Sequence, residues 1–478
     1  MPNHRGMNGI ASPEQTAGKS SSEGTDHDTA ILARWVIPVD SDTPRVLERH
    51  AVCIKGERIA AIVPNDDVGK THTARRVVDH SDTHALIPGL INCHAHTGMT
   101  MLRGYSDDQE LQVWLHKFIW PAEGKFCSPD FVKYGTELAA YEMLKTGTTL
   151  VNDMYFIPDV SAEVFRRAKL RAVLGEAVID FKTGKVKEMV DGSIDFIRRE
   201  KAKNDPWITP SVVTHSSYTV GEEWHAALAR ANNSELQVPF HTHLHETEKE
   251  VADYHTQHGI SAIDSLDRAG VLNERLVAAH CVWLTDEEID KLAERGVNVC
   301  HNPKSNLKLA SGVCDVVKLL RRGVNVCLGT DSSCSNNALN MMSEMQLASL
   351  LAKMKANSAA ALDDFTALRL ATINGARALG KADVLGSLEV GKYADVVAVD
   401  LSADELLPIY DPISHLVYTT ARKVTDVWIG GHHVVDGGHV TTVQVEKEQI
   451  KLFAEKIREF KAEILAKDAQ EADKAKGG

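Results

Sequence analysis

Several features that would mark common protein classes are missing from this 478-residue chain. No run of about 18 apolar residues is present, which excludes a membrane-spanning helix. The eight cysteines are scattered without a C-x-x-C pair, so a zinc knuckle and a thioredoxin-like motif are excluded. Positive charge is scarce, because 53 Lys and Arg face 66 Asp and Glu and leave a net charge of −13. We therefore expect neither nucleic acid nor an anionic membrane as a partner.

The cysteine pattern and the first segment of the chain both indicate a cytoplasmic protein. Unpaired cysteines spread over a long chain are typical of a reducing compartment. Residues 1–25 are small and polar and lack the apolar stretch of a signal peptide, so we predict a disordered tail there. Histidine, in contrast, is abundant. The chain holds 22, and histidine is the commonest metal ligand among the side chains.

Residues 85–385 alternate short apolar runs with helix-like stretches. Eight runs end in polar residues, namely ALIPGLINCHAH, TTLVNDMYF, RAVLGEAV, ITPSVVTH, VPFHTHLHE, RLVAAHCV, VNVCHNP and VNVCLGTDS. Eight strand–helix units in about 300 residues predict an α/β fold of the (β/α)8 TIM-barrel type. An open doubly wound sheet is the alternative, although no G-x-G-x-x-G motif opens the first helix.

Both ends of the chain carry β-like runs outside the predicted barrel. We predict that residues 26–84 and 386–441 together form one small β-sandwich domain, with a hairpin turn at Gly430-Gly431. An amphipathic helix is expected over 442–467, and a solvated tail over 468–478.

Metal-binding and acid–base residue types recur where the predicted barrel strands end. Barrel enzymes build their active sites at this edge. The residues concerned are His94, His96, Asp153, His215, His243, Glu246, His280 and Asp331. His94 and His96 lie two residues apart, so on an extended strand both imidazoles face the same side and can share one cation. An isolated pair of this kind is equally compatible with a structural role, in which one histidine caps a turn and the other lies in the core. Here the pair follows Pro88-Gly89 and an apolar strand, which favours the metal site.

A second set of alternating histidines lies in the segment HTHLHE. His241, His243 and His245 share one face of a strand, and only one or two of them can reach a metal that the H-x-H pair already binds. We assign His243 as the ligand, because Glu246 then follows just past the strand end. His241 and His245 remain alternatives.

Asp331 and His280 each end an apolar run. A carboxylate at the end of a buried strand needs a positive or hydrogen-bonding partner, and both a metal and a helix N-terminus supply one. Both roles therefore stay open for Asp331. His280 on its own is more typical of a core histidine than of a catalytic group.

Three histidines and one aspartate favour Zn²⁺ over Mg²⁺ or Ca²⁺, and we expect one divalent metal per subunit. A metal of this kind lowers the pKa of water to about 7. Glu246 would then transfer protons, and His280 with Asp331 would orient the water and accept its proton. The expected reaction is a metal-assisted hydrolysis.

Five segments resemble the amidohydrolase superfamily, namely PGLINCHAHTGMTMLRG, HLHETEKE, AAHCVWL, HNPKSNLKLASG and LGTDSSCSNN. The late segment GSLEVGKYADVVAVD is similar to the return strand of that superfamily's small β domain. Three more segments, LRGYSDDQELQVWLHKFIWPAE, EMLKTGTTLVNDMYF and VVTHSSYT, resemble the branch that deaminates 5′-methylthioadenosine and S-adenosylhomocysteine. The resemblance covers roughly residues 30–440.

The resemblance implies a role for each candidate residue. The implied metal ligands are His94, His96, His243 and Asp331. Glu246 would deliver a proton to the purine ring, while His280 and Asp331 handle the water. The implied substrate contacts are Glu123 at the ribose hydroxyls, His215 at the purine and Trp114 as a wall, together with Glu246 and Asp331. The implied reaction converts the 6-amino group of an adenosine-type nucleoside to the inosine-type product and ammonia, in a protein expected to be a homo-oligomer.

One position departs from the pattern of this branch. Relatives that accept S-adenosylhomocysteine are expected to offer arginines to its carboxylate, whereas Glu176 stands near that place here. A carboxylate there would repel the homocysteine carboxylate, which favours methylthioadenosine or adenosine. Arg103, Arg171 and Lys182 are possible substitutes.

Two other functions compete with this interpretation. Another hydrolase on the same scaffold, such as an s-triazine hydrolase or a guanine deaminase, would use the same metal ligands. A non-catalytic scaffold protein would be expected to have lost some of the ligands, yet all of the candidate residues are present.

Overall fold

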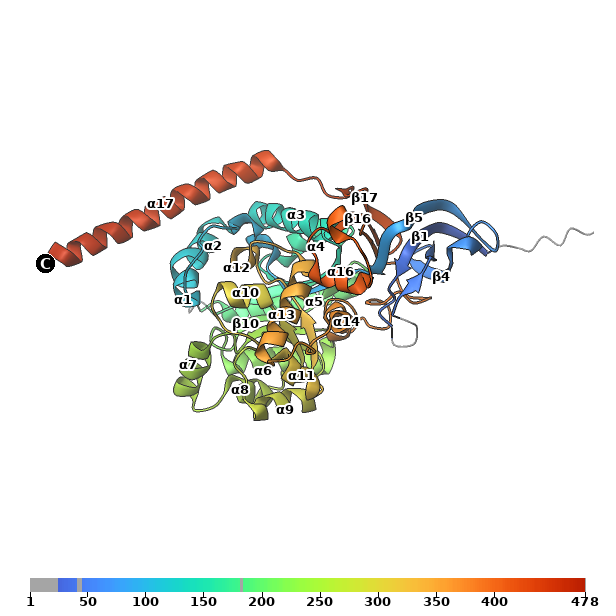
Figure 1. The fold of residues 1–478 in the computed structure, drawn as a ribbon. Helices are drawn as coiled ribbons and strands as arrows, with labels where there is room; N and C mark the ends of the chain where they lie inside the picture. Colours follow the sequence, from blue (N-terminus) through green and yellow to red (C-terminus); the bar gives the residue numbers. More distant parts are fainter. Residues whose placement is uncertain (1–24, 41–44, 181–183, 478) are drawn as a thin grey trace, which may run out of the picture.

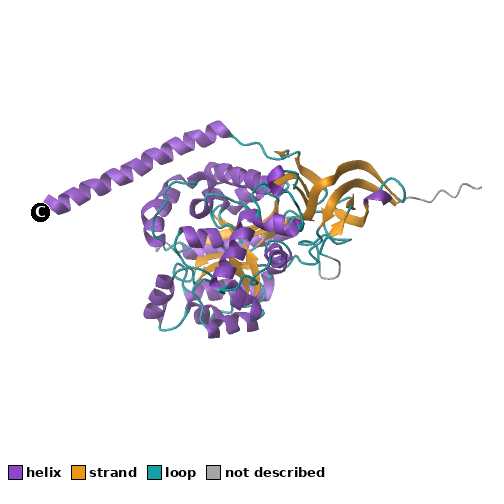
Figure 2. Cartoon of the chain, in the orientation of Figure 1, coloured by secondary structure: helices purple, strands orange, loops and turns teal. Residues whose placement is uncertain are grey.

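Eight parallel strands form the barrel in the computed structural model, which describes residues 25–40, 45–180 and 184–477. They are β6 (Leu90–Ala95), β7 (Thr148–Tyr155), β8 (Arg171–Val178), β10 (Val212–Ser216), β11 (Phe240–Leu244), β12 (Leu276–His280), β13 (Asn298–His301) and β14 (Asn325–Leu328). They pair in this order, with the short β9 (Ile208–Pro210) beside β8. A bridge between Ala95 and Asp331 joins the two ends of the sheet. The predicted (β/α)8 barrel is confirmed, and each apolar run supplies a strand (Figure 2).

Helices surround the barrel and connect its strands (Figure 2). They are α3 (Pro129–Lys145), α4 (Pro158–Ala168), α5 (Val186–Lys203), α6 (Glu222–Ala231), α7 (Glu248–His258), α8 (Ala262–Arg268), α9 (Asp286–Glu294), α10 (Pro303–Lys308), α11 (Val316–Arg321), α12 (Ser333–Asn336), α13 (Met341–Lys355), α14 (Asp364–Leu370) and α15 (Ile373–Ala378). Local sequence sets where several of them begin. Capping boxes start α7 at Thr247 and α9 at Thr285, so the first backbone amides of both helices are satisfied.

The two ends of the chain build one mixed sheet beside the barrel, as expected (Figure 1). Its strands are β1 (Thr25–Val36), β2 (Leu47–Glu48), β3 (His50–Lys55), β4 (Arg58–Pro64), β5 (His72–Pro88), β15 (Val396–Asp400), β16 (Lys423–Ile429), β17 (His432–Asp436) and β18 (His439–Val440). The N-terminal and C-terminal parts meet where β5 pairs antiparallel with β15, and Gly430-Gly431 forms the turn between β16 and β17. The boundary predicted between residues 84 and 85 falls inside β5.

The segment between β6 and α3 is covered by the C-terminal helix. It contains the 3₁₀ turn η2 (Thr97–Leu102), α1 (Leu111–Val113), the π-helical turn η3 (Trp114–Ile119) and α2 (Trp120–Phe126). The C-terminal helix is α17 (Lys447–Gly477), which buries Ile457 and packs Phe460 on Phe126 at a ring distance of 5.6 Å. Ion pairs link α17 to this segment through Lys125–Glu463 at 3.8 Å and Lys117–Asp468 at 2.5 Å.

The helix α17 is longer than the sequence led us to expect. It continues through 468–477, where we predicted a solvated tail. Those residues are rich in Ala, Glu, Lys and Asp and contain neither Gly nor Pro before 477, so nothing in them stops a helix.

No helix in the ranges that the structure describes combines the length and apolar character of a membrane span. The tail predicted over residues 1–25 lies outside the described residues, except that Thr25 already belongs to β1.

Candidate metal centre and substrate pocket

Four of the predicted metal ligands meet at the carboxyl ends of the barrel strands. His94 lies near the end of β6 and His96 just after it, His243 lies in β11, and Asp331 follows β14. One possible ligand atom of each lies within 4.8 Å of those of the other three. The structure therefore gathers the predicted set from three separate strands, although these residues are far apart in sequence.

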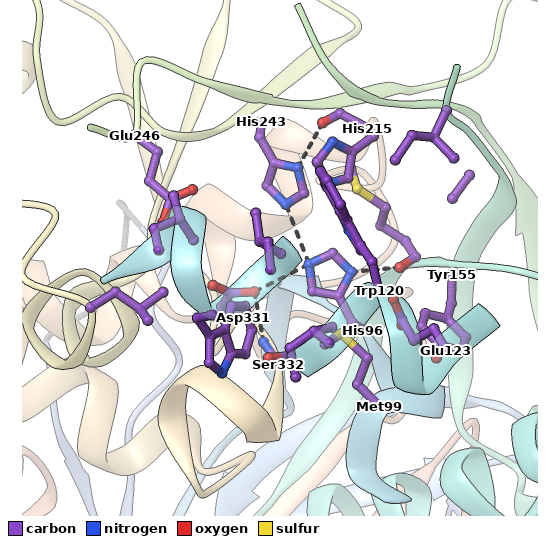
Figure 3. Close-up of a pocket in the computed structure, with 18 of the residues that line it drawn as sticks. His96, Met99, Trp120, Glu123, Tyr155, His215, His243, Glu246, Asp331 and Ser332 are labelled. Atoms are coloured by element: carbon purple, nitrogen blue, oxygen red, sulfur yellow. Dashed lines mark hydrogen bonds and ion pairs between the residues drawn. The ribbon is translucent and has the colours of Figure 1, made fainter. Parts of the chain in front are cut away.

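The ligand atoms of this group face a common point. The Nε2 atoms of His96 and His243 are 3.3 Å apart, and Oδ1 of Asp331 lies 3.2 Å from His96 Nε2 (Figure 3). The same oxygen lies 3.4 Å from His94 Nε2. His94 Nε2 is buried and has no hydrogen-bond partner within the described chain. A buried polar atom without a partner is costly, so the four side chains are arranged to bind one shared group such as a metal ion.

The opposite ring nitrogens of the histidines are held by other groups. His96 Nδ1 donates to the backbone carbonyl of Met154 at 2.6 Å, and His243 Nδ1 donates to that of His215 at 2.6 Å. These bonds fix the tautomer in which Nε2 carries a lone pair. Two lone pairs facing each other at 3.3 Å repel unless a cation lies between them, and outer hydrogen bonds of this kind are typical of metal-binding histidines.

The protonation states of the cluster also suit a divalent cation. Burial lowers the pKa of His94 to about 4 and that of His243 well below its usual value, so both imidazoles are neutral. Burial alone would raise the pKa of Asp331, but the neighbouring imidazoles of His94 and His96 lower it well below its ordinary range. The pKa of His96 is instead raised, because Asp331 beside it outweighs the effect of burial. Three imidazoles and one ionised carboxylate are the donor set that Zn²⁺ prefers, and one such ion fits this site.

The structure resolves the alternatives that the sequence left open. His241 is not part of the group, and its Nε2 instead lies 2.9 Å from His94 Nδ1, where it orients that ring. The Nδ1 of His245 lies 2.9 Å from the backbone carbonyl of Trp283, outside the cluster. The N-cap of α12 is Ser332 rather than Asp331, so the helix-cap role considered for Asp331 was wrong.

Two further candidates lie beside the cluster. Nε2 of His280 is 3.8 Å from Glu246 Oε2 and 4.0 Å from Asp331 Oδ2. Its Nδ1 lies 2.8 Å from Oδ1 of Asn306 and donates to it, which leaves a lone pair on Nε2. Burial raises the pKa of Glu246, whose Oε1 accepts a hydrogen bond from Ser311 at 3.2 Å. Glu246 can therefore act as an acid and His280 as a base, and both lie beside the metal-ligand cluster.

The pocket above this point is bordered by the predicted substrate contacts. Glu123, Trp114 and His215 all line it, together with Glu246 and Asp331. Glu123 is buried, accepts a hydrogen bond from Tyr155 at 2.8 Å, and has its pKa raised by burial to about 7. Glu123 and Glu246 lie on opposite sides of the histidines (Figure 3).

His215 presents one ring nitrogen to the pocket. Its Nδ1 lies 2.9 Å from the hydroxyl of Thr219, and burial lowers its pKa to about 3, so the ring is neutral. In the tautomer in which Nδ1 accepts from Thr219, Nε2 carries the proton and is a hydrogen-bond donor.

Sequence reasoning missed several residues of the pocket. Tyr155 holds Glu123, Trp120 lines the pocket beside His215, and Asn306 and Ser311 orient the acid and the base. Tyr155 had a usable signal, because it lies two residues after Asp153 and thus on the same face at the same strand end. The others come from helices and loops, where no strand period marks them.

Glu176 does not line the substrate pocket, in contrast to our expectation. The same strand contributes Ala177 to the pocket, and Ile179 follows just past its end, whereas Glu176 is not among the lining residues. Glu176 instead accepts a hydrogen bond from the backbone of Ile157, with its pKa raised by burial to about 7. The expected repulsion of a substrate carboxylate by Glu176 was therefore wrong, because the strand turns this side chain away from the pocket.

None of the proposed substitute cations reaches the pocket within the described residues. Arg103 pairs with Glu142, and Arg171 pairs with Asp395 at 3.0 Å. Lys182 lies outside the described residues. The described lining contains neither Lys nor Arg.

An eight-stranded parallel barrel that gathers three imidazoles and a carboxylate at its carboxyl edge defines a metal-dependent hydrolase. Residues 85–434 match the model of the amidohydrolase family, and the chain belongs to that family.

Relatives cover most of the chain. It is 39% identical over 425 residues to a 5-methylthioadenosine/S-adenosylhomocysteine deaminase of Teredinibacter turnerae, an alignment that covers 87% of this chain and 94% of the relative. It is 42% identical over 385 residues to a 5′-deoxyadenosine deaminase of Methanothermobacter thermautotrophicus, covering 80% of this chain and 88% of the relative.

Solved structures agree with this placement. An adenosine deaminase from Xanthomonas campestris with bound zinc superposes with a TM-score of 0.86 at 41% identity, covering 92% of this chain and 99% of the other. A triazine hydrolase superposes with a TM-score of 0.81 at 23% identity, over 90% and 99% of the two chains, and supports the fold alone.

Proposed function

We propose that this protein is a metal-dependent hydrolytic deaminase that converts the 6-amino group of an adenosine-type nucleoside to an oxo group and releases ammonia. The observation that carries the proposal is the pocket itself, in which a gathered metal-ligand set lies beside an acid–base pair and across from a buried carboxylate. The relatives named as adenosine-type deaminases share about 40% of the sequence, which supports the same chemistry.

Each residue of the cluster has a proposed task. A Zn²⁺ ion bound by His94, His96, His243 and Asp331 would supply Lewis acidity and lower the pKa of water. His280, with its lone pair on Nε2, orients the attacking water and accepts a proton from it together with Asp331.

Glu246 is proposed to protonate the purine ring nitrogen next to the reacting carbon. Burial raises the pKa of this carboxyl, which favours the protonated form that the role requires. His215 donates from Nε2 to another purine nitrogen and fixes the ring in the plane of attack. Proton delivery and ring placement therefore come from different strands, β11 and β10.

Glu123 is proposed to bind the ribose. A carboxylate accepts hydrogen bonds from both hydroxyls of a diol, and Tyr155 keeps one oxygen of Glu123 in position at 2.8 Å. Loss of a proton to solvent on substrate binding is expected, because the pKa of Glu123 is about 7 in the free protein. Recognition of the ribose separates this function from guanine deaminase and triazine hydrolase activity.

The lining of the pocket favours a nucleoside with an uncharged 5′ substituent. The described lining is rich in apolar side chains such as Met99, Leu115 and Leu309 and offers no cation to an amino-acid carboxylate. Methylthioadenosine, deoxyadenosine and adenosine are therefore the proposed substrates, with S-adenosylhomocysteine a poorer one.

One wall of the pocket is formed by a helical segment. The free volume of the pocket is about 70 Å³. The segment that contains η3 and α2 carries Trp114, Trp120 and Glu123, so its displacement opens the pocket.

The test is an ammonia-release panel with methylthioadenosine, S-adenosylhomocysteine, adenosine, guanine and a chlorotriazine. We expect the highest kcat/KM for methylthioadenosine or adenosine and a lower value for S-adenosylhomocysteine. Reaction of guanine or the chlorotriazine alone would overturn the proposal. The Glu246→Gln variant serves as the control for a contaminating deaminase.

We also propose where the protein acts and how it assembles. Action in the reducing cytoplasm agrees with eight cysteines that are all free in the structure. Self-association into a homo-oligomer stays a prediction, and light scattering on the purified protein measures it directly.

A further inference from the structure

A second cavity lies away from the metal centre, where the barrel meets the sheet built from the chain ends. It measures about 370 Å³ and is bordered by the end of α3, the start of α13 and the first residues of β16 with the turn before it. That turn follows α16 (Pro412–Tyr418). The cavity shares no lining residue with the substrate pocket.

The side chain that sets this cavity apart is Arg422. One nitrogen, Nη2, donates to the backbone carbonyl of Met342 at 3.0 Å. The other two, Nε and Nη1, are buried and have no hydrogen-bond partner within the described chain. Burial lowers the pKa of Arg422 to about 10, and no carboxylate of the described residues forms an ion pair with it.

A mostly buried guanidinium without an acid is unusual in this molecule. Arg171, which is also buried, has a bidentate partner in Asp395 at 3.0 and 3.2 Å and a third contact to the carbonyl of Pro206. An uncompensated buried charge is strongly destabilising, and proteins normally pair it. Arg422 is therefore the exception that needs a partner from outside the described chain.

Two lysines add positive charge to the same cavity. Lys145 at the end of α3 and Lys423 at the start of β16 both line it, and neither forms an ion pair with any carboxylate of the described residues. Glu142 lies one turn before Thr146, but it is bound to Arg103. The cavity thus collects three cations in a chain whose net charge is −13.

The remaining lining provides neutral hydrogen-bonding groups. They come from Thr146, Asn340, Ser343, Gln346 and Thr420, and no Asp or Glu is among the lining residues. Hydroxyls and amides between cations are the usual companions of a bound oxyanion. The first turn of α13 also borders the cavity and adds a favourable dipole for a negative charge.

We propose that this cavity binds the phosphate group of a small phosphorylated molecule, with Arg422 as its central ligand and Lys145 and Lys423 at its rim. A phosphate group carries nearly two negative charges at neutral pH, which matches a cluster of three cations better than one carboxylate does. The cavity is larger than one phosphate ion, so it also has room for the organic part of such a molecule.

The test uses the full-length protein and inorganic phosphate as the probe, with chloride at equal ionic strength as the blank. Phosphate is expected to raise the Tm of the wild type by about 2–4 °C near saturation, because it binds only the folded state. The Arg422→Gln variant should lose this shift. The double variant Lys145→Ala/Lys423→Ala changes only exposed side chains, so it keeps the fold and should lose at least half of the shift.

The matched control is Lys70→Ala, an exposed lysine of the sheet domain outside the cavity, which should keep the full shift. A shift of equal size in the wild type and in the double variant overturns the proposal, as does the absence of any shift in the wild type. Malonate serves as a dicarboxylate probe. Stabilisation by malonate and not by phosphate would also overturn it.

Discussion

The molecule contains two buried clusters in which imidazoles surround a carboxylate, and they differ in one respect. In the barrel, Asp331 lies between His94 and His96. In the sheet domain, Asp426 lies between His80 at 3.1 Å and His433 at 2.8 Å. Both carboxylates have a pKa well below the usual range, because the neighbouring histidines outweigh the effect of burial.

The difference is where the ring nitrogens point. In the sheet domain each imidazole is directed at Asp426 itself, and His433 stacks on Trp428 with its ring 4.5 Å away and nearly parallel. In the barrel the nitrogens of three rings are directed at a shared point and face one another. A cluster whose nitrogens face its own carboxylate contributes to stability, whereas a cluster whose lone pairs converge on one point is suited to bind a ligand.

The variant Asp331→Asn is the strongest test of the difference between the two clusters. We expect bound metal to be lost and kcat to fall by at least about 10³-fold, because the only anionic ligand of the site is removed. Metal analysis of the purified variant and its circular dichroism spectrum are the measurements. A variant that retains one equivalent of metal and wild-type activity would show that Asp331 is not a ligand.

The variant Glu246→Gln separates proton transfer from metal binding. The structure predicts a fall in kcat of about 10²–10⁴-fold with metal content unchanged, since Glu246 is not in the gathered ligand group. Steady-state kinetics with methylthioadenosine and metal analysis on the same sample measure both. Loss of the metal together with activity would contradict the separate roles.

The variant Glu123→Ala tests the far side of the same pocket. It should lower kcat/KM for nucleosides by about 10–100-fold, the cost of losing charged hydrogen bonds to the ribose, while any activity on free adenine stays unchanged. Competitive inhibition by adenine and by adenosine gives an independent readout. Equal losses for the base and the nucleoside would argue against the ribose role.

The matched change in the sheet domain is Asp426→Asn. Here we expect full metal content and an unchanged kcat, with unfolding made easier by about 1–3 kcal/mol because two buried imidazoles lose their charged partner. Urea unfolding followed by tryptophan fluorescence measures the loss. A drop in activity per bound metal would mean that the two clusters are not as independent as their positions suggest.

The smallest expected effect is in the pH dependence of that stability difference. The folded-state pKa of Asp426 is depressed, so its contribution is complete above the unfolded value of about 4 and is lost as the pH falls below it. The Tm difference between wild type and Asp426→Asn should therefore be constant from pH 6 to 7 and shrink below about pH 4. A difference that grows on acidification would contradict this sign.

Much of the barrel and its ligand set could be predicted from the sequence, because both depend on short-range periodicity. Alternation places His94 and His96 on one face, and the ends of parallel strands meet at one edge. The choice among His241, His243 and His245 was harder, since alternation gives all three one face and only depth in the barrel separates them. The prediction that Glu176 faces the substrate was wrong for a related reason. The strand register that turns this side chain away from the pocket is set by neighbouring strands.

Other features depend on contacts between distant segments and left no trace in local sequence. Only the folded chain reveals the hydrogen bond from Tyr155 to Glu123. The same is true of Arg422, whose Nε and Nη1 have no hydrogen-bond partner within the described residues. The histidine count illustrates the same limit, since His80 and His433 add to the excess and belong to the structural cluster.

The pairing of β5 with β15 also fixes an order of events during synthesis. Pro88 lies opposite Val396, so the ribosome must add about 300 residues before the edge of β5 finds its neighbour. At about 5–20 residues per second, that edge waits for roughly 15–60 seconds, long enough for the barrel strands that follow to be made first. An unpaired strand edge is a template for association with other chains. During synthesis the chain is therefore most prone to aggregate at the edge of β5. This exposure ends when β15 leaves the ribosome and pairs with that edge.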